Sequence, residues 1–345
     1  MIKKNPILVA EISANHNGSI LNAKKLILLA KKSGFDYVKL QTYEPKTMTL
    51  KSNKKEFQIK KGLWKGKTLW NLYDQAQTPF SWQKILFDFC KQKKIKCFST
   101  PFDETAVSLL EKLNCPIYKI ASFEINHIPL IEKVSKTRKP VIISTGMANI
   151  KDIDLAYDTA YKNGAKEIIL LYCISNYPAK HTDFNLSSIE FLKKRYGCKV
   201  GFSDHSIGNE VAVSALAAGA EIFEKHIALK NVKGPDYKFS LKGNEIKSYV
   251  DQLNKVAKYM GKLQFKTSQS QEIYKIYRRS IYATKDINKG EKFNLKNISI
   301  VRPGHGLQPR YFKKILGCKS PYKIKKCSKI PKNILKNFKD KIIAK

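Results

Sequence analysis

The chain has 345 residues, of which 43% are hydrophobic, and this length suits a barrel domain of about 250 residues with a small appendage. No run of about 18 apolar residues occurs and the N-terminus lacks a secretory apolar region, so we expect a cytoplasmic protein without a membrane span. The formal net charge is +37, but the basic residues are overwhelmingly Lys and are spread along the chain. We therefore expect a solvated lysine surface, not a nucleic-acid interface.

Short β-branched, apolar runs alternate with helical patterns as far as residue 260. The expected strands cover residues 7–13, 37–43, 96–102, 117–122, 141–145, 168–175, 200–205 and 222–228. The expected helices cover residues 22–33, 80–94, 104–113, 129–136, 150–163, 186–196, 209–218 and 245–260. This alternation predicts right-handed βαβ units and a parallel sheet, and eight such units close a TIM (β/α)8 barrel.

The connection formed by residues 44–79 is too long for an ordinary loop between a strand and a helix. It carries Trp64, Trp70 and Tyr73 and ends at Thr78-Pro79, which is typical of a helix start. Its aromatic residues are compatible with a lid over a substrate and equally with packing of the segment on itself.

The chain after the barrel pattern divides into a polar stretch and a small module. Residues 263–278 are poor in apolar side chains and are predicted to form a linker, which leaves residues 1–262 as the barrel domain. Residues 279–340 contain short β-like runs around the turn Asn288-Lys-Gly290 and a helical piece near residues 309–316. We expect a small domain made mostly of β-strands and loops.

In a TIM barrel the active site lies at the carboxyl ends of the strands, and here those ends are polar. They carry Glu11, Asn15, His16, Lys39, Gln41, Ser99, Thr100, Lys119, Ser122, Ser144, Ser175, Asn176, Tyr177, Ser203, His205, Glu224 and His226. A lysine inside a strand, such as Lys39 or Lys119, needs an anionic partner. The two lysines and the surrounding hydroxyls predict a pocket for a phosphate or a carboxylate.

Two neighbouring strands end on histidines. Because side chains alternate along a strand, Ser203 and His205 share one face, as do Glu224 and His226. Two imidazoles and an oxygen ligand suit a borderline divalent metal such as Mn, Fe, Co or Zn. The alternative is that each histidine only caps its strand.

Seven cysteines without a CxxC pair predict reduced thiols.

The chain resembles the sialic acid synthase family over nearly its whole length. The resemblance is carried in order by AEISANHNG from Ala10, VKLQT from Val38, STPF from Ser99, YKIAS from Tyr118, STG from Ser144, GFSDH from Gly201 and EKH from Glu224. These enzymes condense phosphoenolpyruvate with an amino-sugar aldehyde to give nonulosonic acids. The tail is similar to their antifreeze-like (SAF) domain.

The resemblance implies roles for individual residues. His205 and His226 match metal ligands, for manganese with magnesium or cobalt as alternatives. Glu11 matches a carboxylate near the sugar and the metal. Arg302 matches an arginine that reaches into a partner subunit's barrel, and this match implies a domain-swapped homodimer. The matching phosphoenolpyruvate shell is Lys39, Thr100, Lys119, Ser122, Ser144 and Ser203, while Tyr177 and Asp236 match residues beside the sugar.

Within the family, loop strings at residues 62–64, 78–79, 121–124 and 238–241 look most like the pseudaminate-forming members. Ser175 stands where neuraminate-forming members carry an Asn, which agrees with a different sugar. N-acetylneuraminate and legionaminate synthesis are alternatives within the family. A metal-dependent barrel aldolase and a non-enzymatic anion-binding protein are alternatives outside it. An aldolase of the Schiff-base kind also needs a barrel lysine, and Lys119 could serve as that lysine. Proton handling is left open between Glu11 and Glu224.

Overall fold

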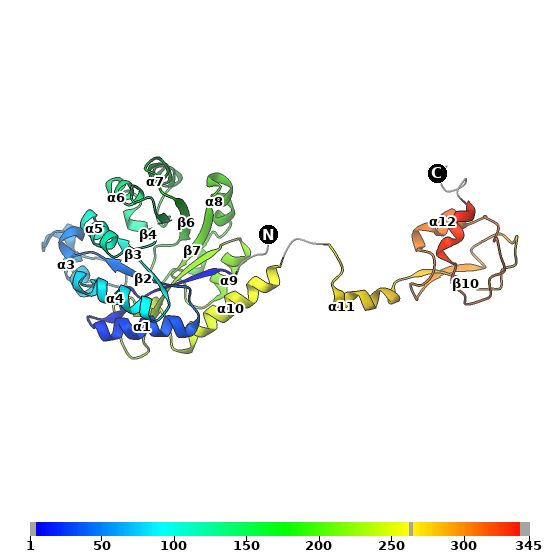
Figure 1. The fold of residues 1–345 in the computed structure, drawn as a ribbon, viewed down its shortest axis with the longest axis horizontal. Helices are drawn as coiled ribbons and strands as arrows, with labels where there is room; N and C mark the ends of the chain where they lie inside the picture. The colour runs from blue at the N-terminus through cyan, green and yellow to red at the C-terminus, as the bar shows by residue number, and fades with distance from the viewer. Residues whose placement is uncertain (1–4, 262–264, 339–345) are drawn as a thin grey trace. The chain divides into compact units, whose positions relative to one another are not determined.

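A computed structural model describes residues 5–261 and 265–338 of the chain (Figure 1). The chain divides into two compact units, residues 1–262 and residues 263–345. Each unit has its own hydrophobic core, built around residues such as Val38 and Ile143 in the first and Ile281 and Phe293 in the second.

The first unit is a closed parallel barrel. Its strands are β1 (Ile7–Glu11), β2 (Tyr37–Thr42), β3 (Lys96–Pro101), β4 (Tyr118–Ile120), β5 (Pro140–Ser144), β6 (Glu167–Cys173), β7 (Lys199–Asp204) and β8 (Ile222–Ala228). They pair in sequence order, and β8 pairs with β1 in a register that sets Glu11 against His226. The predicted TIM barrel is confirmed, with each strand within three residues of its expected bounds.

Helices surround the strands (Figure 1). They are α1 (Ile20–Ser33), α4 (Phe80–Gln92), α5 (Glu104–Lys112), α6 (Ile128–Ser135), α7 (Ile150–Lys162), α8 (Ser188–Tyr196), α9 (Glu210–Ala217) and α10 (Asn244–Met260). Local chemistry fixes several of their ends. The side chain of Ser19 caps α1, which stops at Gly34 with φ +93°, and Asn149 and Asp152 form a capping box on α7.

The long connection after β2, residues 44–79, is folded and contains two short helices. These are α2 (Pro45–Met48) and α3 (Leu69–Ala76), with the 3-10 turn Lys55–Phe57 and an isolated bridge between Gln58 and Thr68. Further 3-10 turns in this unit are Ser13–His16, Ser122–Glu124, His181–Asp183 and Tyr237–Phe239, and the two-residue strand β9 (Leu241–Lys242) pairs with β8. We refer to residues 44–79 as the excursion.

The second unit is built on the antiparallel pair β10 (Ser280–Ala283) and β11 (Ile298–Val301). It also contains α11 (Gln269–Glu272), α12 (Phe312–Ile315) and the 3-10 turns Ile273–Tyr277, Pro309–Tyr311 and Lys332–Phe338. The stretch predicted as a linker therefore includes helical turns in its described part. The ends predicted at residues 262, 263 and 340 lie outside the described residues.

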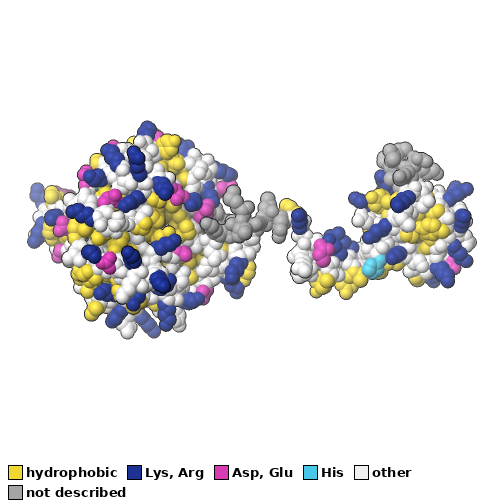
Figure 2. Space-filling model, viewed as in Figure 1, with side chains coloured by type: hydrophobic (Ala, Val, Ile, Leu, Met, Phe, Trp, Pro, Cys, Tyr) yellow, Lys and Arg dark blue, Asp and Glu magenta, His cyan; other side chains and the backbone are white. Residues whose placement is uncertain are grey.

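Lysine and arginine side chains are distributed across the visible face of each unit (Figure 2). On the barrel several stand beside acidic residues, in pairs such as Lys84–Asp88 and Lys193–Glu221. Within residues 5–261 and 265–338, no helix has the length and apolar character needed to cross a bilayer.

Candidate active site

A cavity of about 340 Å³ opens at the carboxyl ends of the barrel strands. Most of the predicted site residues line it. They are Lys39, Gln41, Lys119, Ser122, Ser144, Tyr177, Ser203, His205, Glu224, His226 and Asp236. Glu11, Thr100 and Ser175 are not among the lining residues, and Arg302 is an exposed residue of the second unit.

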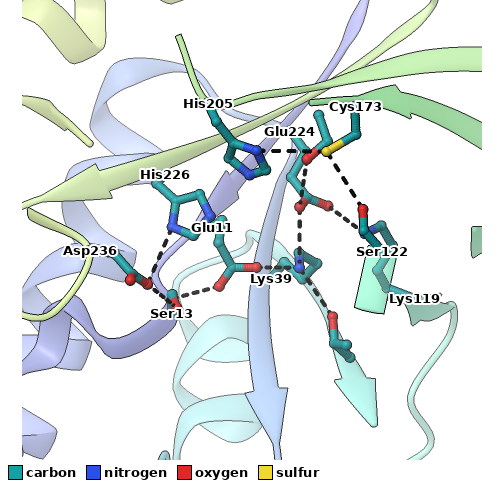
Figure 3. Close-up of polar contacts among 12 residues, drawn as sticks. Glu11, Ser13, Lys39, Lys119, Ser122, Cys173, His205, Glu224, His226 and Asp236 are labelled. Atoms are coloured by element: carbon teal, nitrogen blue, oxygen red, sulfur yellow. Dashed lines mark hydrogen bonds and ion pairs between the residues drawn. The ribbon is translucent and has the colours of Figure 1, made fainter. Parts of the chain in front are cut away.

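Lys39 joins four strand ends at the floor of the cavity (Figure 3). Its Nζ forms an ion pair with Glu11 Oε2, lies 3.3 Å from Glu224 Oε1, and donates a hydrogen bond of 3.1 Å to Thr100 Oγ1. Glu11 in turn accepts a 2.6 Å hydrogen bond from the backbone N–H of Ser13. Glu11 and Thr100 thus hold the lysine that lines the cavity and do not form the cavity wall.

The positive charge of Lys119 is balanced by nearby carboxylates much less than that of Lys39. Its Nζ is 3.7 Å from Glu224 Oε2, its nearest carboxylate oxygen, and the residue is 2% exposed. Burial lowers the pKa of Lys119 and the attraction of Glu224 offsets this only in part, whereas at Lys39 the two carboxylates outweigh burial and raise the pKa. A buried ammonium with so loose a partner gains most from an incoming anion.

The two carboxylates of the floor differ in their electrostatic surroundings. Burial raises the pKa of Glu11 to about 7, although Lys39 opposes the change. At Glu224 burial acts in the same direction, but Lys119 and Lys39 outweigh it and lower the pKa. Glu224 lines the cavity and Glu11 does not, so the geometry separates two residues that the sequence left equivalent.

Hydroxyl groups continue the floor beyond the lysines. Ser203 donates a 3.4 Å hydrogen bond to Glu224 Oε1, while the buried Oγ of Ser144 has no hydrogen-bond partner. Glycine at position 146 allows the side chains of Ser175 and Ser122 to approach the backbone closely, because a Cβ there would lie 2.2 Å from Ser175 Oγ and 2.7 Å from Ser122 Oγ. An unpaired buried hydroxyl facing a cavity is an available donor for a bound anion.

The two histidines lie side by side on β8 and just after β7, with ring centroids 5.5 Å apart (Figure 3). His205 Nδ1 lies 3.0 Å from the carbonyl oxygen of Ile174, so this nitrogen donates a hydrogen bond to that oxygen and Nε2 is the other ring nitrogen. His226 Nδ1 is buried without a hydrogen-bond partner, 3.6 Å from Asp236 Oδ2. Burial lowers the pKa of His226 well below its usual value, which keeps the imidazole neutral.

This donor set fits a divalent ion that takes two protein nitrogens and completes its coordination with substrate or solvent oxygen. Neutral imidazole is the form that binds metal, and the unpartnered nitrogen of His226 has no competing bond. Within the described residues, no group of three or more His, Cys, Asp or Glu side chains is arranged to hold a metal ion.

The lining residues that were not among the predicted site residues include Ser13, Glu124 and Phe239. Ser13 donates a 2.5 Å hydrogen bond to Asp236 Oδ2, and the ring of Phe239 lies 4.9 Å from that of His226. Burial raises the pKa of Glu124 to about 7, and its Oε2 has no hydrogen-bond partner. Glu124 could have been predicted from the sequence, because it stands two positions after Ser122 in the string at residues 121–124. Ser13 and Phe239 could not, because they reach the site through contacts between segments that are distant in the sequence.

The fold and the site define a barrel enzyme with a cationic cavity floor beside two histidines. The NeuB family model matches residues 26–265 and the SAF domain model matches residues 278–326. The chain belongs to the NeuB family. The resemblance to sialic acid synthases noted in the sequence, including its SAF tail, is thereby confirmed.

Individual relatives cover most of the chain. It is 41% identical to the pseudaminic acid synthase of Helicobacter pylori, over 91% of this chain and 93% of the relative. It is 38% identical to the N,N'-diacetyllegionaminic acid synthase of Campylobacter jejuni, over 91% of this chain and 95% of the relative. The crystal structure of the N-acetylneuraminic acid synthetase of Leptospira borgpetersenii matches with a TM-score of 0.70 and 30% identity, over 79% of this chain and 90% of that one.

Proposed function

We propose that this protein condenses phosphoenolpyruvate with 2,4-diacetamido-2,4,6-trideoxy-L-altrose and water to give pseudaminic acid and phosphate. Membership of the NeuB family and the similarity to a pseudaminic acid synthase support the reaction and the sugar. The structural observation that carries the proposal is the under-compensated Lys119, which faces the cavity next to the unpaired hydroxyl of Ser144.

Phosphoenolpyruvate carries a phosphate and a carboxylate, and the floor offers a matching group for each. Lys119 with Ser122 and Ser144 forms one cationic and hydroxyl-rich patch, and Lys39 with Ser203 forms a second around Glu224. Binding both anionic ends fixes the face of the enol that is presented to the sugar, which is a proximity and orientation effect. The C3 carbon then attacks the aldehyde carbon and forms the new carbon–carbon bond.

The reaction next needs water at C2 and loss of phosphate by C–O cleavage. Glu224 faces the cavity between the two lysines, so we assign to it the acceptance of the proton from the attacking water. Glu11 acts through Lys39, whose position it fixes. We propose that His205 and His226 hold a divalent ion, manganese with magnesium or cobalt as alternatives, which when bound would polarise the aldehyde oxygen as a Lewis acid.

A second function within the family is favoured by one observation. The legionaminic acid synthase of Campylobacter jejuni is almost as similar to this chain as the pseudaminic acid synthase is. Synthesis of N,N'-diacetyllegionaminic acid is therefore the alternative, with a stereoisomeric diacetamido-trideoxy sugar as substrate.

The proposal is tested by incubating the full-length chain with phosphoenolpyruvate, manganese and a panel of acetamido-sugars while measuring phosphate release and product mass. We expect turnover with the trideoxy-altrose sugar. Higher kcat/KM with the legionaminate precursor selects the alternative, and no phosphate release with any sugar contradicts the class. In the same assay His226→Ala should lose metal-dependent turnover while phosphoenolpyruvate still binds; full activity would rule out the metal assignment.

We further propose a homodimer in which Arg302 of one copy completes the cavity of another. Arg302 directly follows β11 and is exposed, which suits a contact outside its own unit. Mixed subunits give a direct test: Arg302→Ala and Lys119→Met should each be inactive alone, and a mixture that exchanges subunits should recover activity. A mixture that stays inactive after exchange contradicts a contribution of Arg302 to the cavity of another copy.

All seven cysteines are unpaired, which suits the cytoplasmic location we propose.

A further inference from the structure

One face of α3 points its apolar side chains into the cavity. Leu69, Leu72, Tyr73 and Ala76 follow the i, i+3, i+4, i+7 spacing of a single helical face, and all four line the cavity. Asn71, on the other face, is exposed. In a globular protein such a stripe normally packs against other side chains, whereas this one borders open space.

The rest of the excursion has the same character where it meets the cavity. Met48, Ile59 and Trp64 line the cavity, and no charged residue of the excursion does. The strand ends contribute charged and polar groups to the same cavity, namely the two lysines, Glu224 and the two histidines. We call the four α3 residues the α3 wall.

The α3 wall is held in place by contacts on both sides of the excursion. Tyr43, the residue after β2, donates a 3.3 Å hydrogen bond to the carbonyl oxygen of Tyr73, and their rings lie 6.0 Å apart. Thr68 caps the helix by accepting a 3.1 Å hydrogen bond from the N–H of Asn71. Trp64 donates a 3.2 Å hydrogen bond to the carbonyl oxygen of Pro235, which ties the excursion to the loop after β8. The apolar surface is therefore preorganised.

We propose that the α3 wall is the specificity element for the sugar, and that it selects aldoses whose tail ends in a methyl group over those ending in a hydroxymethyl group. This inference rests on the proposed function for the position of the aldehyde. With the aldehyde at the histidines, the tail of a six-carbon sugar extends into the remaining space, where the α3 wall and its neighbours provide apolar contact.

A hydroxyl on the terminal carbon would lose water at this wall, since the lining side chains of α3 provide no partner other than the hydroxyl of Tyr73. An apolar pocket discriminates against one added hydroxyl only moderately, by roughly 10- to 100-fold. We expect this preference for a 2,4-diacetamido-2,4,6-trideoxyhexose over its counterpart with a hydroxyl at C6.

The test is calorimetric titration of the full-length protein, saturated with phosphoenolpyruvate, with this matched pair of sugars. Manganese is left out so that binding is measured without turnover. Leu72→Asn replaces an apolar group by a polar one of similar shape, and Ala76→Ser adds a single hydroxyl. Asn71→Ala, on the exposed face of the same helix, is the control.

We expect Leu72→Asn to reduce the ratio of the two dissociation constants by roughly tenfold and Ala76→Ser to reduce it less, while Asn71→Ala keeps the wild-type ratio. Unchanged phosphoenolpyruvate affinity in all three variants would show an intact floor. The inference is overturned if wild-type binds both sugars equally, if it binds neither, or if both wall variants keep the wild-type ratio. Failure of the proposed function is a separate result, namely sugar binding with the wild-type preference but no phosphate release once manganese is added.

Discussion

Buried charged and polar groups lie on both the outer and the inner face of the barrel strands, but only those on the outer face all have partners. On the outer face Asp204 and Lys225, which are direct partners in the strand register, are both fully buried and their charged atoms lie 3.0 Å apart. Tyr249 of α10 donates a 3.2 Å hydrogen bond to Asp204 Oδ2, and Ser206 donates two more to Oδ1. Lys225 also donates to the carbonyl oxygen of Ser206 at 2.5 Å.

On the inner face the polar groups are left incomplete. Lys119 is 3.7 Å from its nearest carboxylate oxygen, and His226 Nδ1 and Ser144 Oγ have no hydrogen-bond partner. Burial is equally severe on both faces, so burial alone does not mark a functional site. Buried groups that lack partners around a cavity therefore mark the binding residues, whereas a completed network marks residues that hold strands together.

The largest expected effect comes from removing a charge on the inner face. Lys119→Met should lower kcat/KM by about 10³-fold or more, because a cation that binds substrate and transition state in a water-poor site is lost. Its free energy of unfolding should not fall, because the buried ammonium has only a loose partner. Steady-state kinetics and denaturant titration check the two halves of this prediction, and a marked loss of stability would contradict the comparison.

The same substitution on the outer face is the matched control. Lys225→Met leaves Asp204 buried without its ion-pair partner and should cost about 3–5 kcal/mol of stability. The double variant Asp204→Asn with Lys225→Met should recover part of that loss, since no uncompensated charge remains. Equal stability of the two single Lys→Met variants in a urea titration would show that the two faces do not differ as described.

His16 belongs with the completed networks and gives the next largest effect, this time through pH. Its Nδ1 accepts a 3.2 Å hydrogen bond from the N–H of Gly18 and its Nε2 donates a 3.1 Å bond to Thr78 Oγ1, so the ring is held neutral. Burial lowers its pKa from 6.5 to about 4. The unfolded chain therefore binds the proton more tightly, and stability should fall as the pH drops from 6.5 to about 4.

The expected loss is on the order of 3 kcal/mol, and above pH 6.5 this residue adds no pH dependence. Denaturant titrations across this range measure it. In His16→Gln this part of the pH dependence should be absent, while the part due to carboxylates remains. Identical pH profiles for wild-type and variant would mean that His16 does not stay neutral in the folded state.

Tyr249→Phe is the mildest change to the outer network. It removes one hydrogen bond to Asp204, which keeps Lys225 and Ser206 as partners, and should cost about 1 kcal/mol. Thermal denaturation checks the size of the effect. A loss as large as that in Lys225→Met would contradict the view that the hydroxyl only supplements the ion pair.

Periodicity predicted the barrel well, because strand and helix patterns are local. The alternation of side chains also placed Ser203, Glu224 and both histidines in the cavity and leaves Asp204 and Lys225 facing outward. Alternation could not show that Glu11 and Thr100 lie behind Lys39, since that depends on which strand-end side chain is longest and reaches the cavity. The helical excursion and the contacts of Ser13 and Phe239 were also beyond local patterns, because contacts between distant segments create them.

In the proposed reaction the cationic floor takes phosphoenolpyruvate for a condensation that cleaves its C–O bond. The most direct measurement uses phosphoenolpyruvate labelled with oxygen-18 at the bridging oxygen, together with the trideoxy sugar and manganese. We predict that the released phosphate carries the label and that a nine-carbon acid forms. Label retained in the sugar acid would contradict C–O cleavage, and the absence of any released phosphate would contradict the proposed reaction as a whole.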